Sequence, residues 1–160
     1  MTSRVPALLD YLVDLFTTAG NAANPPFTVY DGPVVTAENV KLLLWVGLTD
    51  PDSDAADSAA TFTQARADLG QLTRDESSSI SCVAEAWSGT GESALSSLRA
   101  SAFAVLAAVE TAIRTNVDQT FGGNGQPMPG VTGAELLQNT TTEGVFARVR
   151  FQIQFRSLNT

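Results

Sequence analysis

The sequence predicts an α+β protein in which an N-terminal helix and a long central helix pack on one face of an antiparallel or mixed β-sheet. Two patterns lead to this class: apolar residues recur at helical spacing in two segments, and elsewhere they alternate with polar residues as in half-buried strands. The chain has 160 residues, of which 44% are hydrophobic and 16% charged. We therefore expect one domain over residues 1–160 with a sizeable core.

The N-terminal part predicts a helix followed by two strands. Residues 4–19 carry apolar side chains at helical spacing, with Ser3 as a candidate cap, and Gly20 with the following NAANPP is expected to end the helix. Residues 27–33 (FTVYDGP) indicate a short strand that ends in a turn. Residues 40–48 are apolar at nearly every position, which is typical of an interior strand covered on both sides.

The rest of the chain predicts further strands around a second helix. Residues 61–69 and 76–87 are strand candidates, and Cys82 falls at a core position of the second. A long helix with a continuous apolar stripe is expected at about 92–115. Residues 131–142 predict a strand that pairs, through the turn Thr142-Glu143-Gly144, with the C-terminal strand.

The C-terminal strand has two contrasting faces. Its apolar face belongs in the core, whereas its polar face carries three of the nine basic residues of a chain whose net charge is −8. Arginine is favoured over lysine at protein interfaces because its planar guanidinium binds carboxylates bidentately. We predict that this face contacts another subunit or a partner protein, the alternative being a merely solvated face. The candidate interface residues are Arg148, Arg150, Gln152, Gln154 and Arg156.

The composition excludes several function classes. No histidine is present and Cys82 is the single cysteine, so Ser–His–Asp and Cys–His catalysis and a structural zinc site are excluded. The net charge of −8 and the single lysine, Lys41, argue against nucleic-acid binding. No apolar run approaches the roughly 20 residues of a membrane span, and the N-terminus lacks the features of a signal peptide. We expect no enzymatic activity, cofactor or membrane partner.

Two loops have a spacing or composition similar to that of ligand-binding loops, but neither predicts a site. Residues 50–58 have the spacing D-x-D-x-D of a calcium loop, but Ala55 and Thr61 stand where an EF-hand needs glycine and glutamate. We interpret this segment as a solvated, mobile loop. The glycine-rich segment 121–130 lacks the lysine and the preceding strand of a phosphate-binding loop, so it is expected to be a connector.

Taken in order, several local motifs resemble the tail terminator proteins of long-tailed bacteriophages, of the lambda type. The resemblance spans nearly the whole chain and depends on the order of motifs that are individually weak. They are an N-terminal helix, Val29-Tyr30-Asp31-Gly32-Pro33, Leu44-Trp45-Val46-Gly47, Arg74-Asp75-Glu76, Ala86-Trp87-Ser88-Gly89, an alanine-rich helix and a closing strand pair over 130–156.

The resemblance implies a structural virion protein without catalytic residues. Such proteins form rings, commonly hexamers, that cap the tail tube, end its polymerisation and offer the joining surface for the head connector. The implied partners are other copies of the chain, the tail tube protein and the connector proteins. The implied location is the tail or neck of the virion, assembled in the cytoplasm of the bacterial host.

Three alternatives remain open at this stage. Another head–tail connector (neck) protein would have the same compact layout. A small-ligand or carbohydrate-binding domain would use Tyr30, Trp45 and Trp87 as a stacking platform. A more remote alternative is a glycosidase that pairs Asp31 with Glu85.

Overall fold

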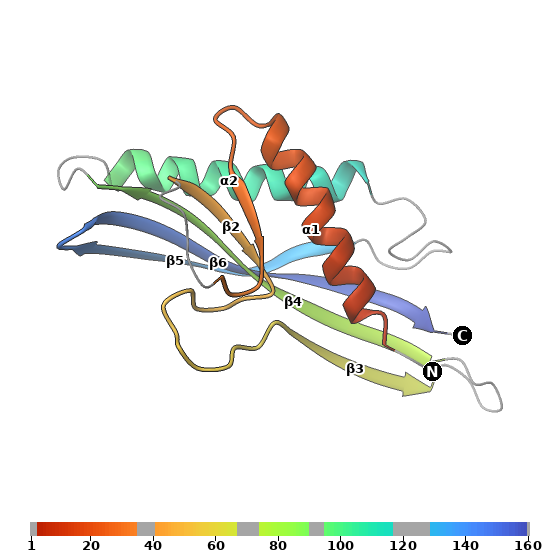
Figure 1. Ribbon diagram of the computed structural model, residues 1–160. Helices are drawn as coiled ribbons and strands as arrows, with labels where there is room; N and C mark the ends of the chain where they lie inside the picture. Colours follow the sequence, from red (N-terminus) through yellow and green to blue (C-terminus); the bar gives the residue numbers. More distant parts are fainter. Residues whose placement is uncertain (1–2, 35–40, 67–73, 90–94, 117–128, 160) are drawn as a thin grey trace.

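The computed structural model describes residues 3–34, 41–66, 74–89, 95–116 and 129–159 of the chain, and shows two helices packed on a six-stranded mixed sheet (Figure 1). The predicted α+β class is confirmed. The elements are α1 (Val5–Ala22), β1 (Thr28–Asp31), β2 (Leu42–Val46), β3 (Ala60–Arg66), β4 (Arg74–Ser88), α2 (Leu95–Thr115), β5 (Gly130–Thr141) and β6 (Gly144–Asn159).

Two long strands form the centre of the sheet. The strand order is β1-β2-β4-β6-β5, and β3 pairs with the first half of β4 beside this path. The β1–β2 pair is parallel and all other pairs are antiparallel. β4 has 15 residues and β6 has 16, and they pair along their whole length. A loop attached to either strand is therefore positioned by the longest hydrogen-bonded ladder in the fold.

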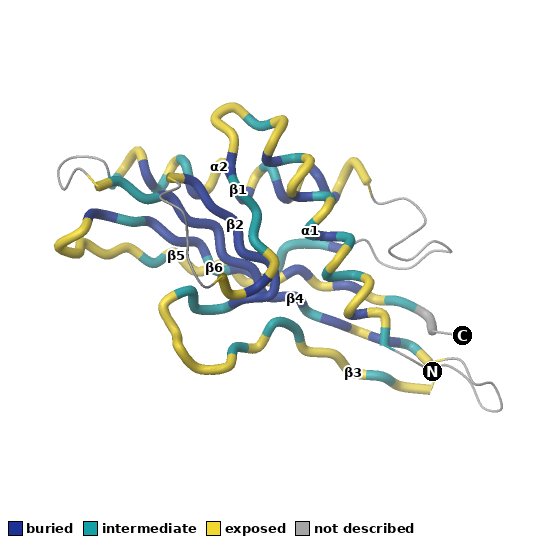
Figure 2. Tube along the Cα trace, in the orientation of Figure 1, coloured by how far each residue is buried: buried dark blue, intermediate teal, exposed yellow. Residues whose placement is uncertain are grey.

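Both helices lie on the same face of the sheet (Figure 1). The apolar face of β6 is buried beneath them, as its alternation predicts, and Figure 2 shows the central strands as the most buried part of the molecule. By length and composition α2 could cross a membrane. Its stripe, however, packs in the main core as predicted, which is the behaviour of a core helix. The stripe consists of Leu98, Ala102, Val105, Leu106, Val109, Ala112 and Ile113.

Helix α1 is longer than the sequence predicts, because Gly20 does not end it. The helix continues to Ala22, and Gly20 is buried inside it. A Cβ atom at Gly20 would lie 2.5 Å from the backbone oxygen of Phe27. The Phe27 N–H donates to the Gly20 carbonyl at 3.2 Å. Gly20 is therefore needed for the close approach of the next segment rather than as a helix stop.

A smaller apolar cluster lies on the opposite face of the sheet. It consists of Leu43, Trp45, Leu48 and Val83, with Tyr30 packed against it. β2 contributes to this cluster and also to the main core, so all five of its residues are buried. The prediction of an interior strand covered on both sides is confirmed.

The β5–β6 hairpin also forms as predicted. β5 ends at Thr141 and β6 begins at Gly144, whose φ of +152° favours glycine. A Cβ atom at Gly144 would lie 2.3 Å from the backbone oxygen of Ser88. The register of β5 against β6 shifts between Thr132 and Glu135, which marks a bulge.

Candidate functional site

The five candidate interface residues lie on one face of β6, the face that the helices do not cover. The register sets Arg148 opposite Glu85, and Arg150 opposite Val83. Further along, the strand partners are serines of β4. This face therefore changes along its length, from charged and apolar neighbours at the hairpin end to hydroxyl neighbours at the other. The serine pairs are Gln152 with Ser81, Gln154 with Ser79 and Arg156 with Ser77.

Arg148 is buried at the centre of an ion-pair cluster, with 7% of its surface exposed. Its Nε donates to Oε2 of Glu85. Nη1 and Nη2 donate to the two carboxylate oxygens of Asp52 at 2.6 and 3.2 Å. The guanidinium also lies over the ring of Phe146, 4.2 Å from its centroid. Each of the three guanidinium nitrogens thus has a partner inside its own chain.

The two carboxylates in this cluster are in different environments. The hydrogen bonds from Arg148 lower the pKa of Asp52, whose side chain is 67% exposed. Burial raises the pKa of Glu85, because the attraction of Arg148 only partly offsets the loss of water. The Arg148 pKa is raised despite its burial, since both carboxylates favour the charged form. The cluster keeps one cation and two acidic groups together.

The acidic loop before β3 is anchored on this face. The Asp57 carboxylate accepts hydrogen bonds from the backbone N–H groups of Thr49, Asp50 and Ser58, at 2.6, 2.8 and 2.7 Å. Asp50 lies 3.7 Å from Arg150 in an ion pair. The interpretation of 50–58 as a merely solvated loop is therefore wrong for its aspartates at 50, 52 and 57, each of which has a partner in the protein.

These aspartates also do not converge on a common point. Asp52 faces Arg148, Asp50 faces Arg150, and Asp57 faces the backbone of its own loop. Within the described ranges, no group of three His, Cys, Asp or Glu side chains is arranged to hold a metal ion.

Arg156 forms a separate, exposed ion pair at the far end of the face. Its Nε lies 3.0 and 2.9 Å from the two carboxylate oxygens of Asp75, and Nη2 donates to the same group. The pairing lowers the pKa of Asp75. Between this pair and the Arg148 cluster, Ser79 donates to Gln152 at 3.1 Å. The exposed members of the candidate set are thus Gln152, Gln154 and Arg156.

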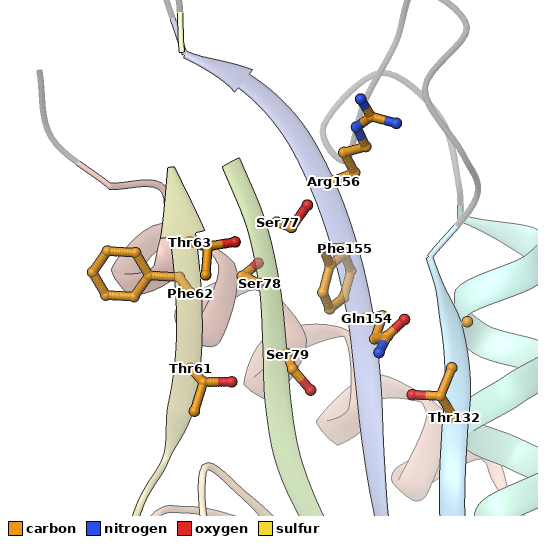
Figure 3. A pocket seen from close by; sticks show the side chains of 11 residues that line it. Thr61, Phe62, Thr63, Ser77, Ser78, Ser79, Thr132, Gln154, Phe155 and Arg156 are labelled. Atoms are coloured by element: carbon orange, nitrogen blue, oxygen red, sulfur yellow. The ribbon is translucent and has the colours of Figure 1, made fainter. Parts of the chain in front are cut away.

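A groove of about 450 Å³ opens beside these exposed residues (Figure 3). Hydroxyl groups from β3 and β4 line it, together with Gln154, Arg156 and Thr132 of β5. Figure 3 shows these side chains along β3, β4, β6 and β5, with the Phe62 ring projecting outward at the side of β3. The residues that line the groove are neutral except for Arg156, and the rings of Phe62 and Phe155 contribute apolar surface. The hydroxyl side chains are those of Thr61, Thr63, Ser77, Ser78 and Ser79.

The structure also places residues that were named for two alternative functions, ligand binding and glycoside hydrolysis. Trp45 is 4% exposed, and its ring lies 6.2 Å from that of Tyr30 at an interplanar angle of 33°, so these rings pack together rather than form an open platform. Asp31 pairs in register with Val46, which faces the main core, whereas Glu85 faces the other side of the sheet. The proposed carboxylate pair is therefore not brought together.

Cys82 is buried in the main core, as predicted. Burial raises the pKa of its thiol to about 12. At neutral pH the side chain is a neutral thiol that packs as a small apolar group.

The sequence reasoning missed the acidic partners of the arginines. Glu85 carried a signal, because it is an acidic residue in the middle of a strand whose neighbours are apolar. Asp52 carried none, since it is separated from Arg148 by 96 residues and only the fold brings the two together. The glycine-rich segment 121–130 lies outside the described residues except for its last two positions.

Comparison of this chain with protein-family models and with curated proteins found no match.

Proposed function

We propose that this protein is a structural subunit of a long-tailed phage, similar to tail terminators, which assembles into a ring that caps the tail tube and joins it to the head connector. The proposal begins from the ordered motifs of the sequence. The fold is compatible with it, because the elements follow the expected order of a first helix, strands, a long helix and a closing strand pair.

One observation carries the proposal further than the motifs do. Both helices cover one face of the sheet, whereas the opposite face exposes polar side chains where β3, β4 and β6 run together. Gln152, Gln154 and Ser77 are exposed there, and Arg156 already has Asp75 as its partner. A neutral, hydrogen-bonding surface of this kind can be desolvated by another protein without stranding an unpaired charge.

The arrangement also supports a role without catalysis. Cys82 is a buried neutral thiol, and Glu85 is engaged by Arg148. The arginines of the polar face act on the protein itself, because they hold the 50–58 loop and the end of β4 in place. We interpret them as the groups that make this face rigid enough to be a docking surface.

The test is the mass of the native particle, followed by its effect on tail tubes. A hexamer of 16.8 kDa chains has a mass of about 101 kDa, which native mass spectrometry separates from the monomer. Electron microscopy should show closed rings, and adding them to polymerising tail tube protein should yield tubes capped at one end. A protein that stays monomeric alone and with tubes would overturn the proposal, and a twelve-fold ring would indicate a connector on the portal side instead.

A further inference from the structure

In the part of the chain that the structure describes, β1, β3 and β5 each have a strand neighbour on one side only, and β3 and β5 are the longer and more exposed of the three. β3 pairs only with β4, and β5 pairs only with β6. An edge strand presents unpaired backbone N–H and C=O groups that can pair with a strand of another chain. Figure 2 shows both strands as largely exposed, in contrast to the buried strands between them.

The two edges run in opposite directions. β3 is antiparallel to β4, β4 to β6, and β6 to β5, so β3 and β5 are antiparallel to each other. When two copies stand side by side in the same orientation, β3 of one copy meets β5 of the next as an antiparallel pair. No rotation of either copy is required for the sheet to continue from one to the other.

Each edge carries a large exposed apolar side chain on the same face of the sheet. Phe62 of β3 is 52% exposed, and its register partner Ser78 is opposite Phe155, which faces the helices. Leu136 of β5 is 38% exposed, and its partner Val149 also faces the helices. Figure 3 shows the Phe62 ring on the side of β3 that faces away from β4. In a continued sheet, the two side chains therefore lie on one face and cover each other.

The β3 edge and the β5 edge also match each other in length and in charge. β3 has seven residues, and the regular part of β5 beyond its bulge, Glu135–Thr141, has the same length. The one charged residue of β3 is Arg66, and the one charged residue of β5 is Glu135. Pairing β3 with another β3, or β5 with another β5, would bring like charges together, whereas pairing β3 with β5 brings opposite charges to one interface. Neither strand contains the proline or lysine that commonly protects a free edge.

We infer that copies of this chain associate head to tail, with β3 of one copy forming an antiparallel pair with β5 of the next. Because the two edges are different surfaces, the contact is heterologous and repeats around a closed ring or along a filament. This inference rests on the proposed function, since it names the contact that would build the ring.

The first arm of the test places a lysine at each edge. Phe62→Lys and Leu136→Lys each put a charge into the apolar contact, whereas Ala104→Lys adds the same charge at an exposed position of α2, on the side that faces Asn24 and Pro25 rather than β5. Native mass spectrometry at one protein concentration should show a loss of rings by about tenfold or more for the two edge variants. Ala104→Lys should form rings as the unsubstituted protein does. Thermal melts check that every variant is folded.

The second arm mixes the two edge variants, one of them labelled with ¹⁵N. Phe62→Lys retains an intact β5 edge and Leu136→Lys retains an intact β3 edge, so one contact can form between them and no further chain can add. The mixture should therefore give a one-to-one heterodimer, while each variant alone stays monomeric. Formation of the dimer also shows that both variants are folded.

The outcomes separate this inference from the proposed function. If the unsubstituted protein forms rings and an edge variant does so equally well, or if the mixture gives no heterodimer, the β3–β5 contact is wrong and the ring stands. If the unsubstituted protein forms no oligomer under any of these conditions, both proposals fail.

Discussion

Arg148 and Glu85 face each other across β6 and β4, and each has only 7% of its surface exposed. The pair lies 63 residues apart in the chain and on the face that the helices leave uncovered. A buried ion pair needs further partners for its remaining hydrogen-bonding capacity. Arg148 finds one in Asp52, so the pair also ties the 50–58 loop to the sheet.

The first prediction concerns the loss of the cation. Arg148→Leu should lower the free energy of unfolding by about 3–5 kcal/mol, because it leaves Glu85 buried without a partner. Replacing both residues, as in Glu85→Leu with Arg148→Leu, should recover much of this loss, since no buried charge then remains. Urea unfolding measures the difference. Arg156→Leu is the control, because its ion pair is exposed and should contribute far less to stability. Equal losses for the two arginine variants would contradict the assignment.

The second prediction concerns acid. Hydrogen bonds from Thr49 and from backbone N–H groups outweigh the effect of burial and lower the pKa of Asp57 below its ordinary value of 3.8. A carboxylate with a lowered folded-state pKa stabilises the fold fully above the unfolded value, and this contribution is lost as the pH falls through the folded value. Asp52 and Asp75 have lowered pKa values and act in the same direction. Burial raises the pKa of Glu85, so its contribution to stability declines as the pH rises above 4.5.

Asp57→Asn should therefore reduce the fall in melting temperature below about pH 4. Thermal melts between pH 7 and pH 2.5 give this slope for the variant and for the unsubstituted protein. Asp54→Asn, in the same loop and exposed, is the matched control. Identical slopes for the Asp57 variant and the unsubstituted protein would show that its hydrogen bonds do not favour the charged form.

The third prediction concerns the helix stripe. Leu98 and Val109 are 8% and 0% exposed and belong to the main core. Leu98→Ala should cost about 2–5 kcal/mol, and the smaller truncation Val109→Ala should also destabilise the fold. Phe103→Ala, on the exposed side of the same helix, should change the unfolding midpoint far less. A Leu98 variant that unfolds at the same urea concentration as the unsubstituted protein would mean that this stripe is not core.

The sequence was sufficient for those parts of the fold in which the pattern is local. The alternation of β6 predicts its buried face because each strand residue reverses direction, and the spacing within α2 predicts the side that packs on the sheet. The prediction that Gly20 ends the first helix was wrong, because the sequence alone does not distinguish a glycine that permits close packing from a glycine that ends a helix. Only the folded structure distinguishes them, through the close approach of Phe27 to Gly20.

The candidate site was predicted in outline but not in its chemistry. The shared polar face of Arg148, Arg150, Gln152, Gln154 and Arg156 follows from alternation alone. Whether an arginine on that face is exposed depends on which loop folds over it, and this is a contact between distant parts of the chain. Asp52 and Asp50 supply that cover for Arg148 and Arg150.

The last prediction concerns the part of the polar face that is exposed. The burial of Arg148 makes it unsuitable for testing assembly, because its replacement disturbs the fold itself. Gln152 and Gln154 are exposed on the same strand, so Gln152→Glu with Gln154→Glu should leave the urea unfolding midpoint nearly unchanged. If this face docks onto a neighbouring subunit or the tail tube, the added negative charges should weaken that docking. The result would be fewer rings, or intact rings that no longer cap tubes, and raising the salt concentration should reduce the difference.

Native mass spectrometry and tube-capping images measure the two effects, with Ala107→Glu and Thr111→Glu on the exposed side of α2 as the control of equal charge. A doubly substituted protein that forms rings and caps tubes normally would mean that the exposed glutamines only contact solvent.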